Sequence, residues 1–134
     1  MLSLVPLLII PFILFNLGLA GLFGSGTGDP FATQMFSVQM MSGGIWTMTV
    51  GDLLIVVALL LLFVEMMKST RTSNASIVDH LLSTFVFVAF LVEFLLVRSA
   101  AHPVFFTLMV IALIDVLGGF SVSLRSAGRD VNLS

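Results

Sequence analysis

The sequence has few charged residues and no cysteine. Charged residues make up 9% of its 134 residues, whereas soluble domains carry about 25%. The missing cysteines exclude disulfides, iron–sulfur ligation and thiol catalysis, and a net charge of −2 excludes the broad basic surface that binds nucleic acid. Hydrophobic residues reach 59%, with a mean hydropathy of +1.23. Because a soluble fold of this length cannot hide so much apolar surface, the chain is predicted to be an integral membrane protein.

Four apolar segments are each long enough to cross a bilayer. About 20 residues at a helical rise of 1.5 Å cover a hydrocarbon core of about 30 Å. The segments cover residues 2–23, 48–67, 77–97 and 104–124, and a polar tail follows. No Lys or Arg precedes the first segment, so we expect a retained helix and not a cleaved signal peptide. The predicted fold class is an all-α membrane protein with four transmembrane helices in one domain, residues 1–134.

Two of the predicted spans begin with a capping pattern. Thr49 is followed three residues later by Asp52, and Ser76 by Asp79. In such a box the hydroxyl and the acidic side chain each accept a hydrogen bond from the other residue's backbone N–H. The helix dipole also favours a carboxylate in the first turn. We therefore expect Asp52 and Asp79 to be helix-start residues with no further role.

The segment between the first two spans contains a short amphipathic pattern. Asp29 and Pro30 are typical of an N-cap and the first helical residue, and a Gly-Gly pair ends the pattern. Apolar residues recur in between at helical spacing, namely Phe31, Met35, Val38 and Met41. About 13 residues are too few to cross the membrane. The sequence therefore predicts an amphipathic interfacial helix over residues 30–42, with Trp46 as an anchor among the headgroups.

Basic residues near the span ends predict the orientation. Those expected on one side are Lys68, Arg71, Arg125 and Arg129, and Arg98 is expected on the other. Cytoplasmic loops carry the excess of Lys and Arg. Both termini are therefore expected in the cytoplasm, and residues 24–47 on the periplasmic side of a bacterial inner membrane.

Asp115 lies near the middle of the fourth predicted span, where a carboxylate is costly. Insertion scales give about 2.5–3.5 kcal/mol at the helix centre. Ala112, Gly118 and Gly119 share its face and allow another helix to approach closely. Two interpretations stay open. Asp115 is either a proton or cation site, or a buried hydrogen-bond partner of a neighbouring helix, where Asn16 or a hydroxyl group would meet it.

Two further acids lie inside the predicted spans, each with a basic residue nearby. Glu93 is about 7 Å below the interface by the helical rise, and Arg98 follows five residues later. We expect a structural ion pair between them, within the subunit or across an oligomer interface, with a transport role as the alternative. Glu65 precedes Lys68 by three residues at the cytoplasmic end of the second span, so a helical ion pair accounts for it.

The polar residues of the spans lie at different predicted depths. Glu65 is expected at the cytoplasmic edge, Asp115 near the midplane, and Asn16 and Glu93 in the periplasmic third. Chains of acids carry protons in some pumps. The same ladder arises by coincidence if these side chains do not face a common interior.

The sequence contains no recognisable catalytic, metal or cofactor motif. It has no phosphate-binding glycine loop, Ser-His-Asp set or dinucleotide fingerprint. His80 and His102 are expected at opposite membrane faces and cannot share a metal ion. The methionines from Met35 to Met48 scatter around the predicted helix, which favours an adaptable apolar surface over copper binding. We predict no metal, no cofactor and no enzymatic activity.

Parts of the second and third predicted spans resemble a known family. They are Gly51–Leu54, Phe63–Arg71, Asp79–His80 and Leu91–Leu95. In these residues the chain resembles small uncharacterised multi-helix inner-membrane proteins of alphaproteobacteria, over most of residues 48–122. The resemblance implies a bacterial inner-membrane location and brings no activity or site residue with it.

The sequence favours a non-enzymatic function. Its polar loops are too short to bind a soluble ligand, so we expect contacts with the lipid bilayer and with proteins in it. The leading hypothesis is an accessory, scaffolding or self-assembling subunit of a homo-oligomer or a larger membrane complex. The alternative is an oligomeric proton or ion channel or transporter that uses Asp115 and Glu93.

Overall fold

The computed structural model describes residues 6–21, 29–68 and 74–133, with the backbone alone for residues 68, 74–77 and 122–133. Helices dominate these residues. They are α1 (Ile9–Leu19), α2 (Val50–Lys68), α3 (Asn74–Leu96) and α4 (Pro103–Leu133), with the short 3-10 helices η2 (Pro30–Ala32) and η3 (Arg98–Ala100). An antiparallel hairpin of β1 (Gln34–Gln39) and β2 (Ile45–Thr49) precedes α2.

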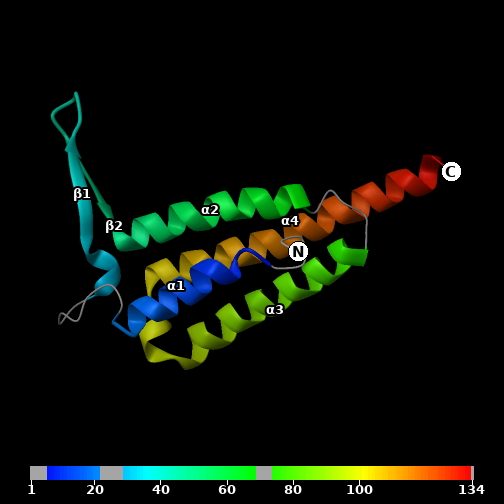
Figure 1. Ribbon diagram of the computed structural model, residues 1–134, viewed down its shortest axis with the longest axis horizontal. Helices are drawn as coiled ribbons and strands as arrows, with labels where there is room; N and C mark the ends of the chain where they lie inside the picture. The colour runs from blue at the N-terminus through cyan, green and yellow to red at the C-terminus, as the bar shows by residue number, and fades with distance from the viewer. Residues whose placement is uncertain (1–5, 22–28, 69–73, 134) are drawn as a thin grey trace.

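The described helices form an up-and-down bundle in which α4 is central (Figure 1). It packs along α2 and α3, and α1 contacts α2 and α4. One end of the bundle gathers the last turns of α1 and α3, the first turns of α2 and α4, and the hairpin; we call it the hairpin end. At the opposite end α4 runs past the other helices (Figure 1).

Three of the four predicted spans are confirmed as helices that are long and apolar enough to cross a membrane. Their apolar windows are Val50–Met67, Val78–Leu96 and Pro103–Ser121. The helix α1 is apolar but has 11 residues, which correspond to about 16 Å, or half of a hydrocarbon core. Residues 2–5 and 22–23 of the first predicted span lie outside the described residues.

The helix α4 continues to Leu133, beyond the end predicted for the fourth span at Leu124. Polar residues end an apolar stretch without ending a helix. The tail contains no proline, and Arg125 and Ala127 are good helix formers, so nothing in the backbone chemistry stops the helix where hydropathy falls.

The first predicted capping box is confirmed, and the second is wrong. Thr49 N–H donates to Asp52 Oδ2, and Asp52 N–H donates to Thr49 Oγ1, both at 3.2 Å. The helix α3 instead begins at Asn74, and no acidic residue lies in its first turn. Asp79 therefore lies in the second turn, where it is buried. The start lies two residues earlier because Asn74 is itself a residue type favoured at helix starts.

The interfacial helix predicted for residues 30–42 is wrong. After η2 the chain forms the hairpin, whose tip is closed by Met40 N–H to Gly44 O at 2.7 Å and by Gly43 N–H to Met40 O at 3.0 Å. Gly43 has a φ of +91°, the left-handed conformation that such short hairpin loops need. A bulge near the start of β1 shifts the register, so apolar residues at a helical spacing also fit a strand here.

Aromatic side chains form the core near the hairpin end. The fully buried ones are Phe15, Phe31, Phe90 and Phe105. Phe15 stacks on Phe31 with ring centroids 4.2 Å apart, and Phe105 contacts Phe15 at 4.7 Å and Phe90 at 5.2 Å. Each such pair contributes about 0.5–1.5 kcal/mol beyond the burial of its area. These contacts join α1, η2, α3 and α4 into one core.

Candidate functional site

Three acids lie inside the bundle on three different helices. Glu65 of α2, Asp79 of α3 and Asp115 of α4 are 2%, 3% and 5% exposed, and each interacts with other groups. Burial of an uncompensated carboxylate would be costly. The sequence analysis singled out Glu65 and Asp115 as acids within spans, but it assigned Asp79 to a helix start. In the structure α3 begins five residues before Asp79, which places this carboxyl group within the helix.

Glu65 joins α2 to the start of α1. Its Oε1 accepts a hydrogen bond from Leu7 N–H at 2.7 Å. Leu7 lies just before α1, where the leading N–H groups of a helix lack intrahelical partners and the helix dipole is positive. Glu65 therefore ties the turn that precedes α1 to α2. The side chain of Lys68, its predicted partner, lies outside the described residues.

Asn16 lies against Glu93, so α1 and α3 bring their polar side chains together. The Asn16 side chain is a hydrogen-bond partner of the Glu93 carboxyl group, and its Nδ2 also donates to Phe12 O at 2.9 Å. Glu93 Oε2 is buried, with no hydrogen-bond partner among the described residues. In the same part of the chain no ion pair joins Glu93 to Arg98, because α3 ends at Leu96 and Arg98 lies exposed in η3. A pair across an oligomer interface stays a prediction.

Asp115 faces the interior of the bundle from α4. Ala112, on the same face, is also buried, and Gly118 allows Met66 of α2 to approach the α4 backbone closely. Since Met66 follows Glu65, this contact puts Glu65 and Asp115 within about one helical turn of each other along the bundle. The polar residues that were predicted at a series of depths therefore lie in two groups along the bundle. One group is Glu65 and Asp115, and the other is Asn16 and Glu93.

The acids and histidines of the described residues do not cluster. Over residues 6–21, 29–68 and 74–121, no set of three or more His, Asp or Glu side chains could hold a metal ion. On α3, Ser83 is 3% exposed, and its Oγ has no hydrogen-bond partner among the side chains described. The interior of the bundle thus contains separate polar groups, and Ser83 Oγ and Glu93 Oε2 lack a hydrogen-bond partner among the described residues.

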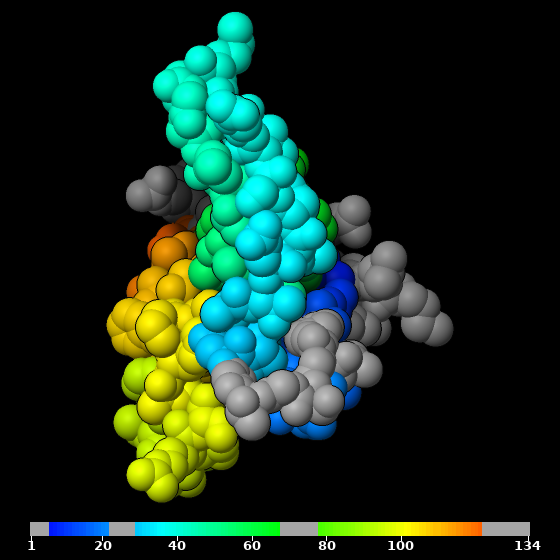
Figure 2. Space-filling model, turned by 90° about the vertical axis from the view of Figure 1, so that its left-hand side faces the viewer, coloured from blue at the N-terminus to red at the C-terminus, as the bar shows by residue number. Residues whose placement is uncertain are grey.

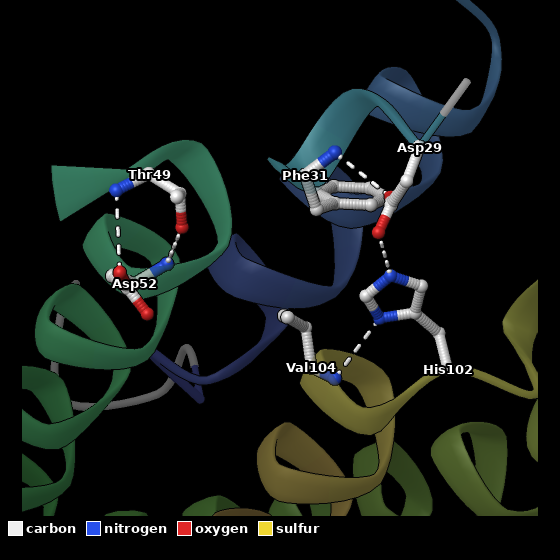
Figure 3. Close-up of polar contacts among 6 residues, drawn as sticks. All are labelled: Asp29, Phe31, Thr49, Asp52, His102 and Val104. Atoms are coloured by element: carbon white, nitrogen blue, oxygen red, sulfur yellow. Dashed lines mark hydrogen bonds and ion pairs between the residues drawn. The ribbon is translucent and has the colours of Figure 1, made fainter. Parts of the chain in front are cut away.

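A second polar site lies at the hairpin end (Figure 3), and sequence analysis did not predict it. His102 Nε2 meets Asp29 Oδ2 at 2.5 Å, and Asp29 Oδ1 accepts from Phe31 N–H at 3.0 Å. Val104 N–H donates to His102 Nδ1 at 3.0 Å. Because Nδ1 acts as an acceptor, the proton lies on Nε2, which donates to the carboxylate. His102 therefore caps α4 with one ring nitrogen and holds Asp29 with the other.

The electrostatics of this site favour a charged Asp29. Burial raises the pKa of Asp29, but the hydrogen bonds from the His102 ring and from Phe31 N–H lower it, and the resulting pKa is below its usual value. The His102 ring also packs edge-on against Phe31, with ring centroids 5.5 Å apart. A polar contact and an aromatic contact thus fix the same short segment.

Backbone contacts fasten the hairpin to α2. Val50 N–H donates to Thr33 O at 2.9 Å. A Cβ added at Gly51 would lie 2.7 Å from Val104 Cγ2 and 3.1 Å from Phe31 O, so glycine is needed for this approach. We call the residues that attach the hairpin segment to the bundle the clamp. They are Phe15, Asp29, Phe31, Gly51 and His102.

The hairpin itself has one apolar and one mainly polar face. Cross-strand pairing and the alternation of side chains put Phe36, Val38, Trp46 and Met48 on the apolar face. The other face carries Gln34, Ser37, Gln39, Ile45 and Thr47. Ser37 Oγ lies 2.9 Å from Thr47 Oγ1. Figure 2 looks at the hairpin end and shows the hairpin extending outward past the bundle.

The two polar sites differ in what they can do. The groups inside the bundle are buried ionisable side chains on three helices, whereas the clamp attaches a hairpin outside the bundle. Comparison with known proteins adds nothing to this choice: no protein-family model, curated protein or solved structure matches the chain.

Proposed function

We propose that the protein is a non-enzymatic accessory or scaffolding subunit of a membrane assembly. In this proposal four spans anchor it in a bacterial inner membrane, α1 with its flanking residues being the fourth. Both termini are cytoplasmic, and the hairpin end is periplasmic. The observation that carries the proposal is the clamp. Its buried aromatic rings and its Asp–His contact hold a hairpin that lies outside the bundle.

The hairpin is suited to presenting a fixed surface to another protein. In the described part of the chain no third strand pairs with β1 or β2. Open strand edges offer unpaired N–H and C=O groups, which an extended segment of a partner can use. An isolated two-stranded hairpin is marginally stable in water, so the clamp supplies rigidity that the hairpin lacks by itself.

Photocrosslinking tests this proposal. With p-benzoylphenylalanine in place of Ser37, on the polar face of the hairpin, we expect a crosslink in native membranes to another subunit or a second copy. The crosslinked protein should also co-purify at a fixed stoichiometry. The matched control places the same group at Val88, which is exposed on α3 and should give mainly lipid adducts. A monomeric chain with no protein crosslink from the Ser37 position would contradict the proposal.

The second candidate function is an oligomeric proton or ion channel. The specific observation in its favour is the set of carboxyl groups inside the bundle, with Glu93 Oε2 lacking a partner among the described residues. Acids within membrane segments mark proton relays in pumps and transporters. In this candidate, Asp115 and Glu93 would exchange protons across an oligomer.

Substitutions at Asp115 separate the two functions. In the accessory function Asp115 is structural, so Asp115→Asn should assemble almost normally and Asp115→Leu should weaken the bundle by about 0.6–2 kcal/mol. Unfolding in mixed micelles measures this loss, and Ile114→Leu on the exposed side of α4 is the control. A pH-dependent flux in proteoliposomes that disappears in Asp115→Asn, with unchanged stability, would instead establish the channel. We expect the structural outcome.

A further inference from the structure

We propose that the hairpin lies flat in the interfacial layer of the bilayer that α2 enters, with its apolar face against acyl chains and its polar face toward water. The occupant of the apolar face is therefore phospholipid. This inference goes beyond the accessory function. A partner protein bound to the polar face or to the strand edges would leave the apolar face of the hairpin uncovered, and the inference concerns that face.

The position of the hairpin along the bundle matches this layer. The strand β2 ends at Thr49, and the apolar window of α2 begins at Val50. The bond from Val50 N–H to Thr33 O also holds β1 at the level of the first turn of α2. The hairpin runs across the direction of the helices (Figures 1 and 2). When the helices cross a membrane, the hairpin consequently lies along its surface.

The chemistry of the hairpin also matches this layer. No charged residue occurs from Pro30 to Gly51, so insertion requires no charge to leave water. Trp46 and Phe36 pack edge-on with ring centroids 5.2 Å apart, and tryptophan is enriched at the membrane interface. The open strand edges need hydrogen-bond partners, which headgroups and water provide and hydrocarbon does not.

An apolar groove lies between the start of β1 and the outer surface of α2. Met35, at the bulge of β1, lines an apolar groove together with Leu14, Val50, Leu53, Leu54 and Val57. Leu53 faces outward from α2, where lipid surrounds a spanning helix. A protein is a poorer occupant, because four partly exposed side chains offer far less than the roughly 800 Å² per partner of a standard interface.

Trp46 is the only tryptophan of the chain, so its fluorescence reports directly on this face. The full chain is reconstituted at one copy per nanodisc in phosphatidylcholine with brominated or ordinary acyl chains. We expect brominated chains to reduce Trp46 emission by about half or more. Aqueous iodide should quench it weakly. One copy per disc excludes a second copy as the source of shielding and makes the result independent of the accessory function.

The matched control is the double variant Trp46→Phe, Thr47→Trp, which moves the tryptophan to the polar face. It should be quenched strongly by iodide and weakly by brominated lipid. Similar quenching patterns for the two proteins would overturn the proposal, since the hairpin would then have no preferred face. Shielding of Trp46 from both quenchers would also overturn it, because protein would then cover the face.

Discussion

Replacement of Phe31 by alanine is expected to lower the free energy of unfolding by about 3–5 kcal/mol. Phe31 is 2% exposed and stacks on Phe15, and its backbone N–H binds Asp29. Truncation of its ring leaves a cavity between η2 and the bundle, which its packed neighbours cannot fill. Chemical unfolding in mixed micelles measures the loss. The hairpin should also become mobile, because η2 precedes the hairpin and Phe31 is the buried side chain that holds η2 against the bundle.

The matched control for this prediction is Phe36→Ala in the hairpin. Phe36 is 43% exposed and packs on Trp46 alone among the aromatic residues described. Its truncation in micelles should cost much less than that of Phe31. Equal losses for the two variants would show that the hairpin is not held through Phe31 and would remove the basis of the clamp.

Alanine at Gly51 is expected to destabilise the protein by about 1–3 kcal/mol, the usual cost of overpacking. The added Cβ would lie 2.7 Å from Val104 Cγ2 and 3.1 Å from the backbone oxygen of Phe31. Backbone cannot yield as a flexible side chain does. Replacement of glycine by alanine inside a helix normally stabilises the protein by about 1 kcal/mol. At Gly51 the steric clash is expected to outweigh this gain, so that the variant is less stable.

Two other glycines calibrate this measurement. At Gly44 an added Cβ meets only Ser42 Oγ, at 3.5 Å, so Gly44→Ala should change stability little. At Gly118 the obstacle is the flexible end of Met66, which can move aside. Thermal unfolding of the three alanine variants should therefore rank Gly51→Ala as the least stable. A Gly51→Ala protein as stable as the parent would mean that η2 does not lie this close to α2.

Hydropathy predicted α2, α3 and the apolar part of α4 because a spanning helix has one simple requirement, a long run of apolar residues. About 20 consecutive residues must be apolar to replace water by hydrocarbon, and no tertiary contact is needed to recognise this pattern. The end of α4 was not predictable in the same way. Hydropathy reports the boundary of the membrane, whereas backbone hydrogen bonding decides where the helix ends, and α4 continues to Leu133.

The hairpin was not predicted because a bulge in β1 interrupts the two-residue alternation of apolar side chains that is typical of a strand. Met35 and Val38 are three residues apart, which suits a helix, but the register shift before Phe36 changes the count. A stronger local signal for a hairpin is present in the sequence, and the sequence analysis did not use it. A Gly-Gly pair between two short runs that contain Phe, Val, Ile and Trp is typical of a hairpin.

The candidate sites were predictable only where polarity itself is the signal. Asp115 and Glu65 stand out because an acid in an apolar stretch is rare, and both are buried in the structure. The contact of Asn16 with Glu93 and that of Asp29 with His102 depend on how the helices pack. A single sequence does not contain that information, since Asp29 and His102 are 73 residues apart.

This separation also orders the biosynthesis of the protein. Chains are made from the N-terminus, so Asp29 and the hairpin are synthesised well before His102. The Asp29–His102 contact of the clamp can form only after the first turn of α4 has been made. A copy with α4 inverted would carry His102 to the wrong face and leave Asp29 without its partner. In the proposed topology, the Asp29–His102 contact can therefore form only when the last helix has inserted with its first turn on the side of the hairpin.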